Sequence, residues 1–250
     1  MRKFSSYGPV DADMNFYAPR KELIEKAWNQ LTGENPDKGG HYITVWAPRQ
    51  TGKTWLMQQI LWRLQKDDRF HVLKINLEHL KRETDVDEIV ATIAEEIREE
   101  LEVDKPPVKR LKEFNGLFRK DVLDKPLVLI MDEFDALAED AISGIAGVFR
   151  NIYVHRRDDP APSHEKKYLL HGVALIGVRS VLGIENVKGS PFNVQRGIHI
   201  PELTLDEVDG MFKWYERESG RGVAPDVVER IYYETSGQPG LVSWLGELLT

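Results

Sequence analysis

Strand-like and helix-like segments alternate along the first four fifths of the chain. Short apolar runs, typical of strands buried on both faces, occur at residues 43–46, 72–77, 127–131, 173–178 and 197–200. Between them apolar residues recur at helical spacing, most clearly over 86–101, where Asp85 and Glu88 form a candidate N-cap and its third-position partner. This alternation predicts an α/β fold with a parallel sheet and crossover helices.

The pattern changes after Pro201. Helices are predicted over 205–219, 225–235 and 239–249, and no further strand is predicted. We therefore expect an α/β core over 1–200, with an N-terminal entry segment over 1–40, and a small helical lid subdomain over 201–250. The last predicted helix has no cap and no polar tail, so we expect the lid to be truncated at its C-terminus.

One further helix and one long loop complete the pattern. A helix is predicted from residue 136 to about 154, and the proline- and charge-rich stretch 156–167 is predicted to be an exposed loop. Arg156 and Arg157 in this loop are either solvated side chains or fingers for the site of a neighbouring copy.

Composition narrows the class of protein. The 250 residues are 41% apolar and 30% charged, as in ordinary soluble globular domains, and no stretch approaches the ~18 apolar residues of a membrane span. The chain has no cysteine, which excludes disulfides, thiolate metal sites and cysteine nucleophiles and suits a cytoplasmic location. The histidines lack paired ligand spacing, so no structural zinc is predicted.

Charge argues against one class of partner without excluding it. A net charge of −7 disfavours broad, sequence-independent binding to nucleic acid, which relies on a basic surface. A modest local cluster of basic residues is either a solvated helix face or a nucleic-acid contact: Lys105, Lys109, Arg110, Lys112, Arg119 and Lys120.

The strand at 43–46 leads into a candidate phosphate-binding loop, and a helix follows the loop. Backbone N–H groups near Gln50 to Thr54, at the positive end of the helix dipole, would meet the phosphates of ATP or ADP. Gly52 allows close backbone approach, Lys53 supplies a charge to the β- and γ-phosphates, and the Thr54 hydroxyl is a candidate Mg²⁺ ligand. The nucleotide-binding candidates here are Arg49, Gln50, Thr51, Gly52, Lys53, Thr54 and Trp55.

This loop departs from the usual pattern at its start. Ala47 stands where the first glycine is common, and Pro48 has no N–H to donate. The essential donors lie downstream, so nucleotide binding is the favoured interpretation and a degenerate loop is the alternative.

The strand at 127–131 ends in two carboxylates. Asp132 is a candidate Mg²⁺ ligand, mostly through water, and Glu133 is the candidate catalytic residue that orients the attacking water. The alternative is that both merely cap the next helix, and capping or another structural role is favoured for Asp135. Arg179, directly after the strand at 173–178, is a third catalytic candidate beside Lys53 and Glu133, or else a surface arginine.

In this order the segments resemble an AAA+-related family, most closely the bacterial "AAA-like domain" group and its relatives among the STAND signalling ATPases. The resemblance rests on Gly8-Pro9-Val10, residues 16–23, the loop at 47–54 with its Pro-Arg-Gln, Asp132-Glu133, the Ser-Pro-Phe-Asn segment at 190–193, and Ser236-Gly237-Gln238-Pro239-Gly240-Leu241. It implies a five-stranded parallel sheet in the order 5-1-4-3-2 with a helical lid, and a sensor role for Arg179. It also implies that Tyr17, Pro19, Arg20 and Pro239 lie near the base of the nucleotide.

Three functions follow as hypotheses. The leading one is a slow or partner-stimulated ATPase that acts as a regulatory switch, with a possible homo-oligomer in the ATP state and further fused or partner domains. The alternatives are an AAA+ loader acting on nucleic acid and a non-hydrolysing, nucleotide-dependent binding module. Intact Lys53, Thr54, Asp132 and Glu133 argue against the last. The preference for ATP over GTP rests on the resemblance.

Overall fold

The chain forms five strands and seven α-helices in the part described by the computed structural model, residues 1–177 and 196–250. The strands are β1 Tyr42–Trp46, β2 His71–Asn76, β3 Leu127–Asp132, β4 Leu170–Gly177 and β5 Arg196–His199. The helices are α1 Lys21–Thr32, α2 Lys53–Leu64, α3 Val86–Glu100, α4 Glu139–Asp158, α5 Leu205–Ser219, α6 Pro225–Thr235 and α7 Pro239–Leu249. Short 3₁₀ helices cover Glu78–Leu80, Leu111–Phe118 and Phe134–Ala136.

The five strands form one parallel sheet in the order β2-β3-β4-β1-β5. Read from the other edge this is 5-1-4-3-2, so the predicted fold class is confirmed. Each predicted strand lies within a few residues of an observed one, because near-continuous apolar runs identify strands that are covered on both faces. All residues of β3 and β4 are buried.

The described chain divides into two compact units. We call residues Ile24–Trp46 and Met57–His199 the sheet unit, and residues Met1–Leu23, Ala47–Leu56 and Ile200–Thr250 the helical unit. None of the helices within the described ranges is long and apolar enough to cross a membrane.

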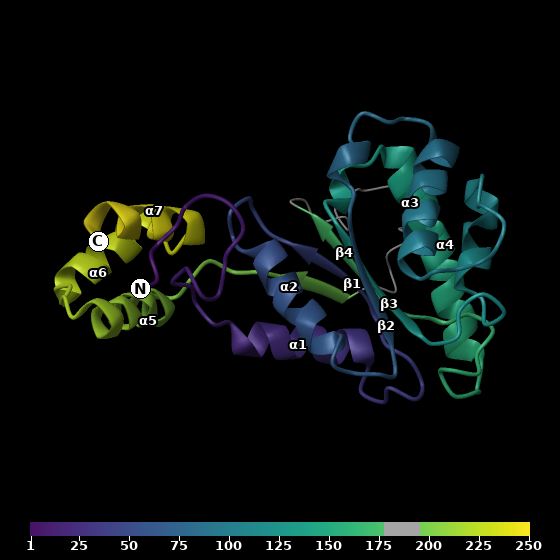
Figure 1. The fold of residues 1–250 in the computed structure, drawn as a ribbon, viewed down its shortest axis with the longest axis horizontal. Coiled ribbons are helices and arrows are strands. Elements are labelled where there is room, and N and C mark those ends of the chain that lie inside the picture. Colours follow the sequence, from purple (N-terminus) through teal and green to yellow (C-terminus); the bar gives the residue numbers. More distant parts are fainter. Residues whose placement is uncertain (178–195) are drawn as a thin grey trace. The chain divides into compact units, whose positions relative to one another are not determined.

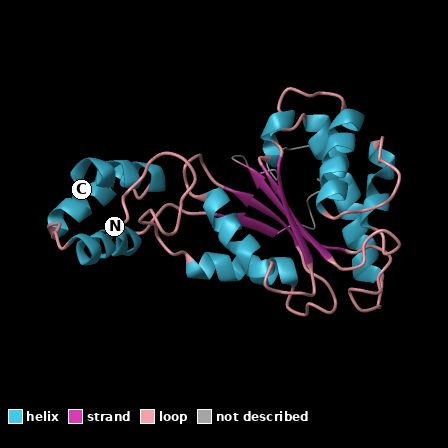
Figure 2. Ribbon diagram, in the orientation of Figure 1, coloured by secondary structure: helices cyan, strands magenta, loops and turns pink. Residues whose placement is uncertain are grey.

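Helices cover both faces of the sheet in the sheet unit (Figures 1 and 2). Figure 1 shows α3 and α4 on one side and α1 and α2 on the other. The core under α3 and α4 includes Ile93, Phe114, Leu129 and Phe149, each fully buried. Asp85 begins α3 by accepting hydrogen bonds from the N–H groups of Asp87 and Glu88, which confirms it as the N-cap.

The helical unit has its own aromatic core. Phe4 and Phe16 of the N-terminal segment pack with Phe212 and Tyr215 of α5. The three predicted helices of this region coincide with α5, α6 and α7, and Thr204 forms a capping box at the start of α5.

Two expectations about the segment around α4 are corrected. The α-helix begins at Glu139 rather than 136, because Glu133 adopts a left-handed conformation and a separate 3₁₀ turn follows it. The helix then continues to Asp158, and the stretch predicted to be an exposed loop is partly core: Arg156 and Lys166 are 5% and 4% exposed. Periodicity could not reveal this, since both side chains contact residues 7 to 12 positions away, beyond the helical repeat. A buried Arg156 is not free to act as a finger.

Candidate functional site

The phosphate-loop candidate begins at the residue after β1 and ends where α2 starts at Lys53. Gln50 and Gly52 have φ values of 61° and 84°, so the backbone turns twice through the left-handed region. The Thr51 hydroxyl donates to the Pro48 carbonyl over 2.8 Å and closes the turn. The first N–H groups of a helix have no intrahelical acceptor, so this turn presents donors suited to phosphate.

Lys53 is held against its own loop. Its Nζ donates to the carbonyl oxygens of Ala47 at 2.9 Å and Pro48 at 2.7 Å, and the side chain is buried. Ala47, the departure from the usual glycine, is fully buried and supplies one of these acceptors. Arg49, Gln50 and Thr54 are exposed. The ammonium is therefore placed at the loop, and Thr54 is accessible to a ligand.

The start of α7 is hydrogen bonded to the same loop, within the helical unit. The Gly240 N–H donates to the Gln50 carbonyl over 3.2 Å, and Nε2 of Gln238 donates to the Arg49 carbonyl over 3.3 Å. A Cβ on Gly240 would lie 2.9 Å from Cβ of Gln50, so only glycine allows this approach. Oε1 of Gln238 also accepts from the Leu241 N–H and caps α7.

These contacts give Gln238 a role that the sequence analysis missed. A polar residue directly before a proline at a helix start is an N-cap candidate, which was the available signal. Its second contact, with the Arg49 carbonyl, spans 189 positions of the chain and had no local signal. Pro239 occupies the first turn of α7, beside this contact.

The entry segment brings an aromatic group and an arginine to the helical unit. The Tyr17 ring meets Trp55 and Trp214 edge-on, with centroids 5.2 and 5.5 Å apart. Nε of Arg20 lies 3.4 Å from Oε1 of Glu207 on α5, and its guanidinium also donates to the Pro201 carbonyl. Burial lowers the pKa of Arg20, and Glu207 opposes that shift. Pro19 is exposed. Contact of these residues with a base stays a prediction.

The acidic candidates lie at the carboxyl end of β3 in the sheet unit. Asp132 is 1% exposed, and its Oδ2 lies 3.1 Å from Nζ of Lys74, which projects from β2. Its Oδ1 accepts from the Glu133 N–H over 3.1 Å. Lys74 could not be predicted from the sequence, because nothing local indicates which strand will be the neighbour of β3. Among the described residues, Asp132 is thus a buried carboxylate paired with the Lys74 ammonium.

Glu133 has a strained backbone at the end of this strand. Its φ of 55° is unusual for a residue other than glycine, and such outliers concentrate at functional sites. The side chain is partly exposed. Helix α4 begins six residues later with Ala138 at its N-cap and no side-chain cap, so neither carboxylate caps that helix.

Asp135 and Arg179 were also considered from the sequence. Asp135 packs against the end of β4, where a Cβ on Gly177 would lie 2.7 Å from its Oδ1. Arg179 and the Ser-Pro-Phe-Asn segment lie outside the described residues. Within 1–177 and 196–250, no cluster of three or more His, Asp or Glu side chains is arranged to hold a metal ion.

Comparisons with known proteins agree with this fold. A family model described as "AAA-like domain" matches residues 5–245. Three solved structures are similar: the Walker-type ATPase PABY2304 of Pyrococcus abyssi (15% identity, TM-score 0.60), Drosophila ORC bound to DNA (16%, 0.58) and Cdc6p from Pyrobaculum aerophilum (18%, 0.57). The matches cover 98%, 92% and 96% of this chain, and 70%, 54% and 62% of those chains.

At these identities the structural likeness shows the fold alone, and the chain spans only 54–70% of the neighbours' lengths. No curated protein matches the sequence at a significant level. The family match, in contrast, covers nearly the whole chain and includes the phosphate loop, the acidic strand end and the start of α7. The chain therefore belongs to the AAA-like domain family of AAA+-related P-loop ATPases.

Proposed function

We propose that this chain binds Mg-ATP, hydrolyses it slowly, and uses the nucleotide state to control the position of α7. The observation that carries the proposal is the pair of hydrogen bonds from Gly240 and Gln238 to the carbonyls of Gln50 and Arg49. If phosphate binding changes the shape of the loop at 47–54, it moves the Gln50 and Arg49 carbonyls that accept from the start of α7. Nucleotide and helix are then coupled through shared backbone groups.

The donor set fits a magnesium nucleotide. The turn at 50–54 offers backbone N–H groups, and Lys53 offers a charge that now rests on two carbonyls. A phosphate oxygen is anionic and therefore a stronger acceptor than a carbonyl, so Lys53 is expected to turn to it. Mg²⁺ usually takes one or two protein ligands together with substrate phosphates, for which Thr54 and Asp132 suffice.

Glu133 is the residue proposed to orient the attacking water. Its partly exposed carboxylate directly follows the buried Asp132, and its left-handed backbone sets the direction in which it leaves the strand. The bound Mg²⁺ would neutralise charge that develops on the phosphates. Arg179 stays a candidate for sensing the γ-phosphate.

Phosphate release from Mg-ATP by the parent chain and by Glu133→Gln tests the enzymatic part. The parent is expected to turn over, while Glu133→Gln binds ATP and releases little phosphate, because an amide cannot accept the proton of the water. Lys53→Ala serves as the control that loses binding. Nucleotide binding without turnover by the parent would favour a nucleotide-dependent binding module.

Hydrogen exchange of the α7 amides tests the switch. In the parent, a non-hydrolysable ATP analogue with Mg²⁺ is expected to change protection at residues 239–242. Gln238→Ala is expected to abolish that change, while nucleotide still binds. Gln65→Ala, which alters an exposed glutamine directly after α2, is the matched control. Equal changes of protection at residues 239–242 in all three proteins would show that Gln238 does not couple the nucleotide to α7.

Action on nucleic acid is the second candidate. One similar structure is of a protein bound to DNA, and the six basic residues of the 105–120 segment are all exposed. The net charge of −7 and the ion pair of Arg119 with Asp121 weigh against it. The test is binding of duplex DNA by the parent chain and by a variant in which these six residues are neutral. Binding by the parent that weakens steeply with salt and is lost in the variant would favour the loader over the switch.

A further inference from the structure

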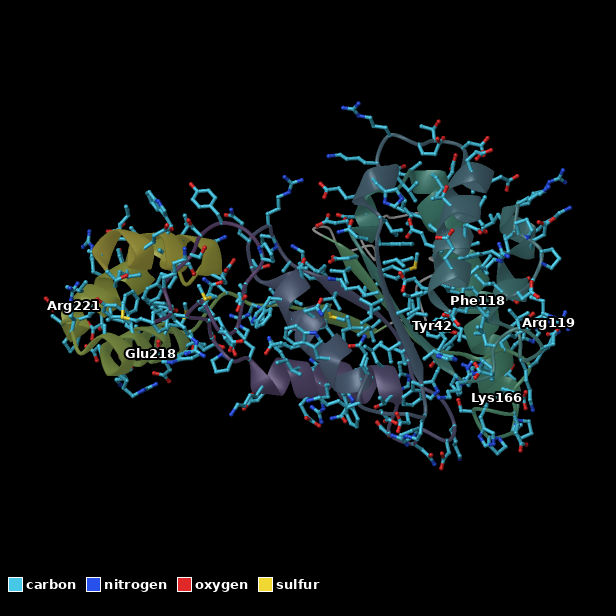
Figure 3. The ribbon with its side chains drawn as sticks, viewed as in Figure 1. Tyr42, Phe118, Arg119, Lys166, Glu218 and Arg221 are labelled. Carbon is cyan, nitrogen blue, oxygen red and sulfur yellow. The ribbon has the colours of Figure 1, made fainter. Side chains whose placement is uncertain are left out.

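A cavity of about 370 Å³ opens at the amino-terminal edge of the sheet, within the sheet unit. The 38–41 segment before β1, the last turn of α4 and the loop before β4 line it. Figure 3 labels Lys166, which belongs to its wall. The phosphate loop follows the other end of β1, about 16 Å along a five-residue strand. The cavity is therefore separate from the nucleotide site proposed above.

Positive charge dominates the lining. Four cations, Lys38, Arg156, Arg157 and Lys166, face one carboxylate, Asp159. Arg157 is exposed and lies 3.4 Å from Asp158, whereas Arg156 and Lys166 are buried and form no ion pair with any described residue. The negative end of the α4 dipole offsets part of this charge. Lys38 and Lys166 come from other segments, so the helix alone does not explain the cluster.

The two buried cations have more donors than the described residues satisfy. Arg156 donates from Nη1 to the Tyr168 carbonyl and from Nη2 to the Ser163 hydroxyl, which uses two of five N–H groups. Lys166 donates to the Arg156 carbonyl, which uses one of its three. Burial lowers the pKa of both groups, and Asp159 opposes that shift. Buried charge without a paired counter-ion is costly, and one carboxylate among four cations leaves an excess of positive charge that favours a bound anion.

A chain of buried hydrogen bonds fixes the Arg156 side chain in place. The Ser163 hydroxyl, which accepts from Arg156, lies 2.8 Å from Nδ1 of His171, and Nε2 of His171 lies 3.0 Å from the Thr32 carbonyl. Gly40, which lines the cavity, packs closely against the end of α1, since a Cβ there would lie 1.8 Å from the Leu31 carbonyl oxygen. Donors fixed in this way bind an anion without further ordering of the protein.

We propose that this cavity binds a small phosphorylated ligand of about the size of a nucleoside monophosphate. The phosphate lies at Arg156 and Lys166, where a guanidinium fork and an ammonium match its oxygens. The organic part lies along Tyr153 and His41, which contact each other at 3.3 Å. A nucleic-acid backbone does not fit, because cations that are about 95% buried are out of reach of a duplex.

Calorimetric titration of the whole chain with 5′-AMP and with inorganic phosphate tests the proposal. The parent is expected to bind 5′-AMP saturably below ~10 mM and more tightly than phosphate. Lys166→Met and Lys38→Gln are each expected to weaken 5′-AMP binding about tenfold, the effect of one lost charge-assisted contact. Lys38 is exposed, so its variant tests the site even if Lys166→Met fails to fold.

Two control variants separate this site from others. Lys120→Gln alters an exposed lysine elsewhere on the sheet unit, and Lys53→Ala alters the phosphate loop; both are expected to bind 5′-AMP like the parent. Absence of saturable binding would overturn the proposal. The proposal would also be overturned if Lys53→Ala abolished 5′-AMP binding while Lys166→Met and Lys38→Gln left it intact. Equal affinity for phosphate and 5′-AMP would overturn the assignment of the organic part.

Discussion

His171 should make the stability of the sheet unit depend on pH. This residue of β4 is fully buried between the Ser163 hydroxyl and the Thr32 carbonyl. A carbonyl only accepts, so Nε2 carries the proton and Nδ1 accepts from Ser163. The folded state thus holds a neutral imidazole, and adding a second proton would place a charge in the core.

The size of the effect follows from the pKa values of the two states. Burial lowers the pKa of His171 to about 3; the Thr32 carbonyl opposes the shift, and Arg156, Arg69 and Lys166 add to it. In the unfolded chain the pKa is about 6.5. The unfolded state therefore binds more protons at lower pH, and stability falls as the pH drops from about 6.5 to about 3. At about pH 5 the loss is about 2 kcal/mol.

Urea unfolding at about pH 7.5 and about pH 5 measures this loss. His171→Gln keeps an N–H donor for the Thr32 carbonyl but does not titrate, so it is expected to lose about 2 kcal/mol less than the parent on acidification. His164→Gln, which changes an exposed histidine, is expected to follow the parent. Equal losses of unfolding free energy by the parent and His171→Gln between the two pH values would refute a role for His171 in the pH dependence.

Four further substitutions test the site and the packing within each unit. Lys74→Met leaves the buried Asp132 carboxylate without its cation, which should lower the free energy of unfolding by about 3 kcal/mol or more. Added Mg²⁺ should raise the Tm of this variant more than that of the parent. An equal rise in both proteins would contradict a metal role for Asp132. Gly237→Ala puts a Cβ 2.0 Å from the Leu203 carbonyl oxygen at a φ of 75°, so the Tm should fall. Gly210→Ala places its Cβ in open space on α5, so it should raise the free energy of unfolding by about 0.5–1 kcal/mol and with it the Tm. Similar Tm values for the two glycine variants would refute this contrast. Asp85→Ala removes the N-cap of α3 and should cost about 1 kcal/mol in urea unfolding, while an unchanged midpoint would show that the cap is redundant.

The elements of the fold were predictable because their signals are local. Helices α5, α6 and α7 coincide with the predicted ranges, since amphipathic periodicity and nearby Pro and Gly residues mark both their bodies and their ends. The strands were found as apolar runs because both faces of this sheet are covered. The phosphate loop and the acidic strand end were likewise visible as residue types in their expected local context.

Sheet order came from family resemblance, since local pattern alone does not choose neighbours among parallel strands. For the same reason the sequence did not show that Lys74 of β2 would pair with Asp132 of β3. Gln238 was visible as part of a helix start, but its bond to the Arg49 carbonyl required the fold.

Burial of charge was decided by tertiary structure in the same way. Arg156 and Lys166 lie in a stretch rich in proline and charge, and composition predicts such a stretch to be solvated. Arg156 donates to the Tyr168 carbonyl and to the Ser163 hydroxyl, and Ser163 contacts His171 of β4. These contacts form only when the chain after α4 folds back to enter β4. The sequence by itself determined where helices and strands form, because backbone propensity and periodicity act over a few residues. Only the tertiary structure decided which of these polar groups meet, because their contacts reach beyond the few residues over which propensity and periodicity act.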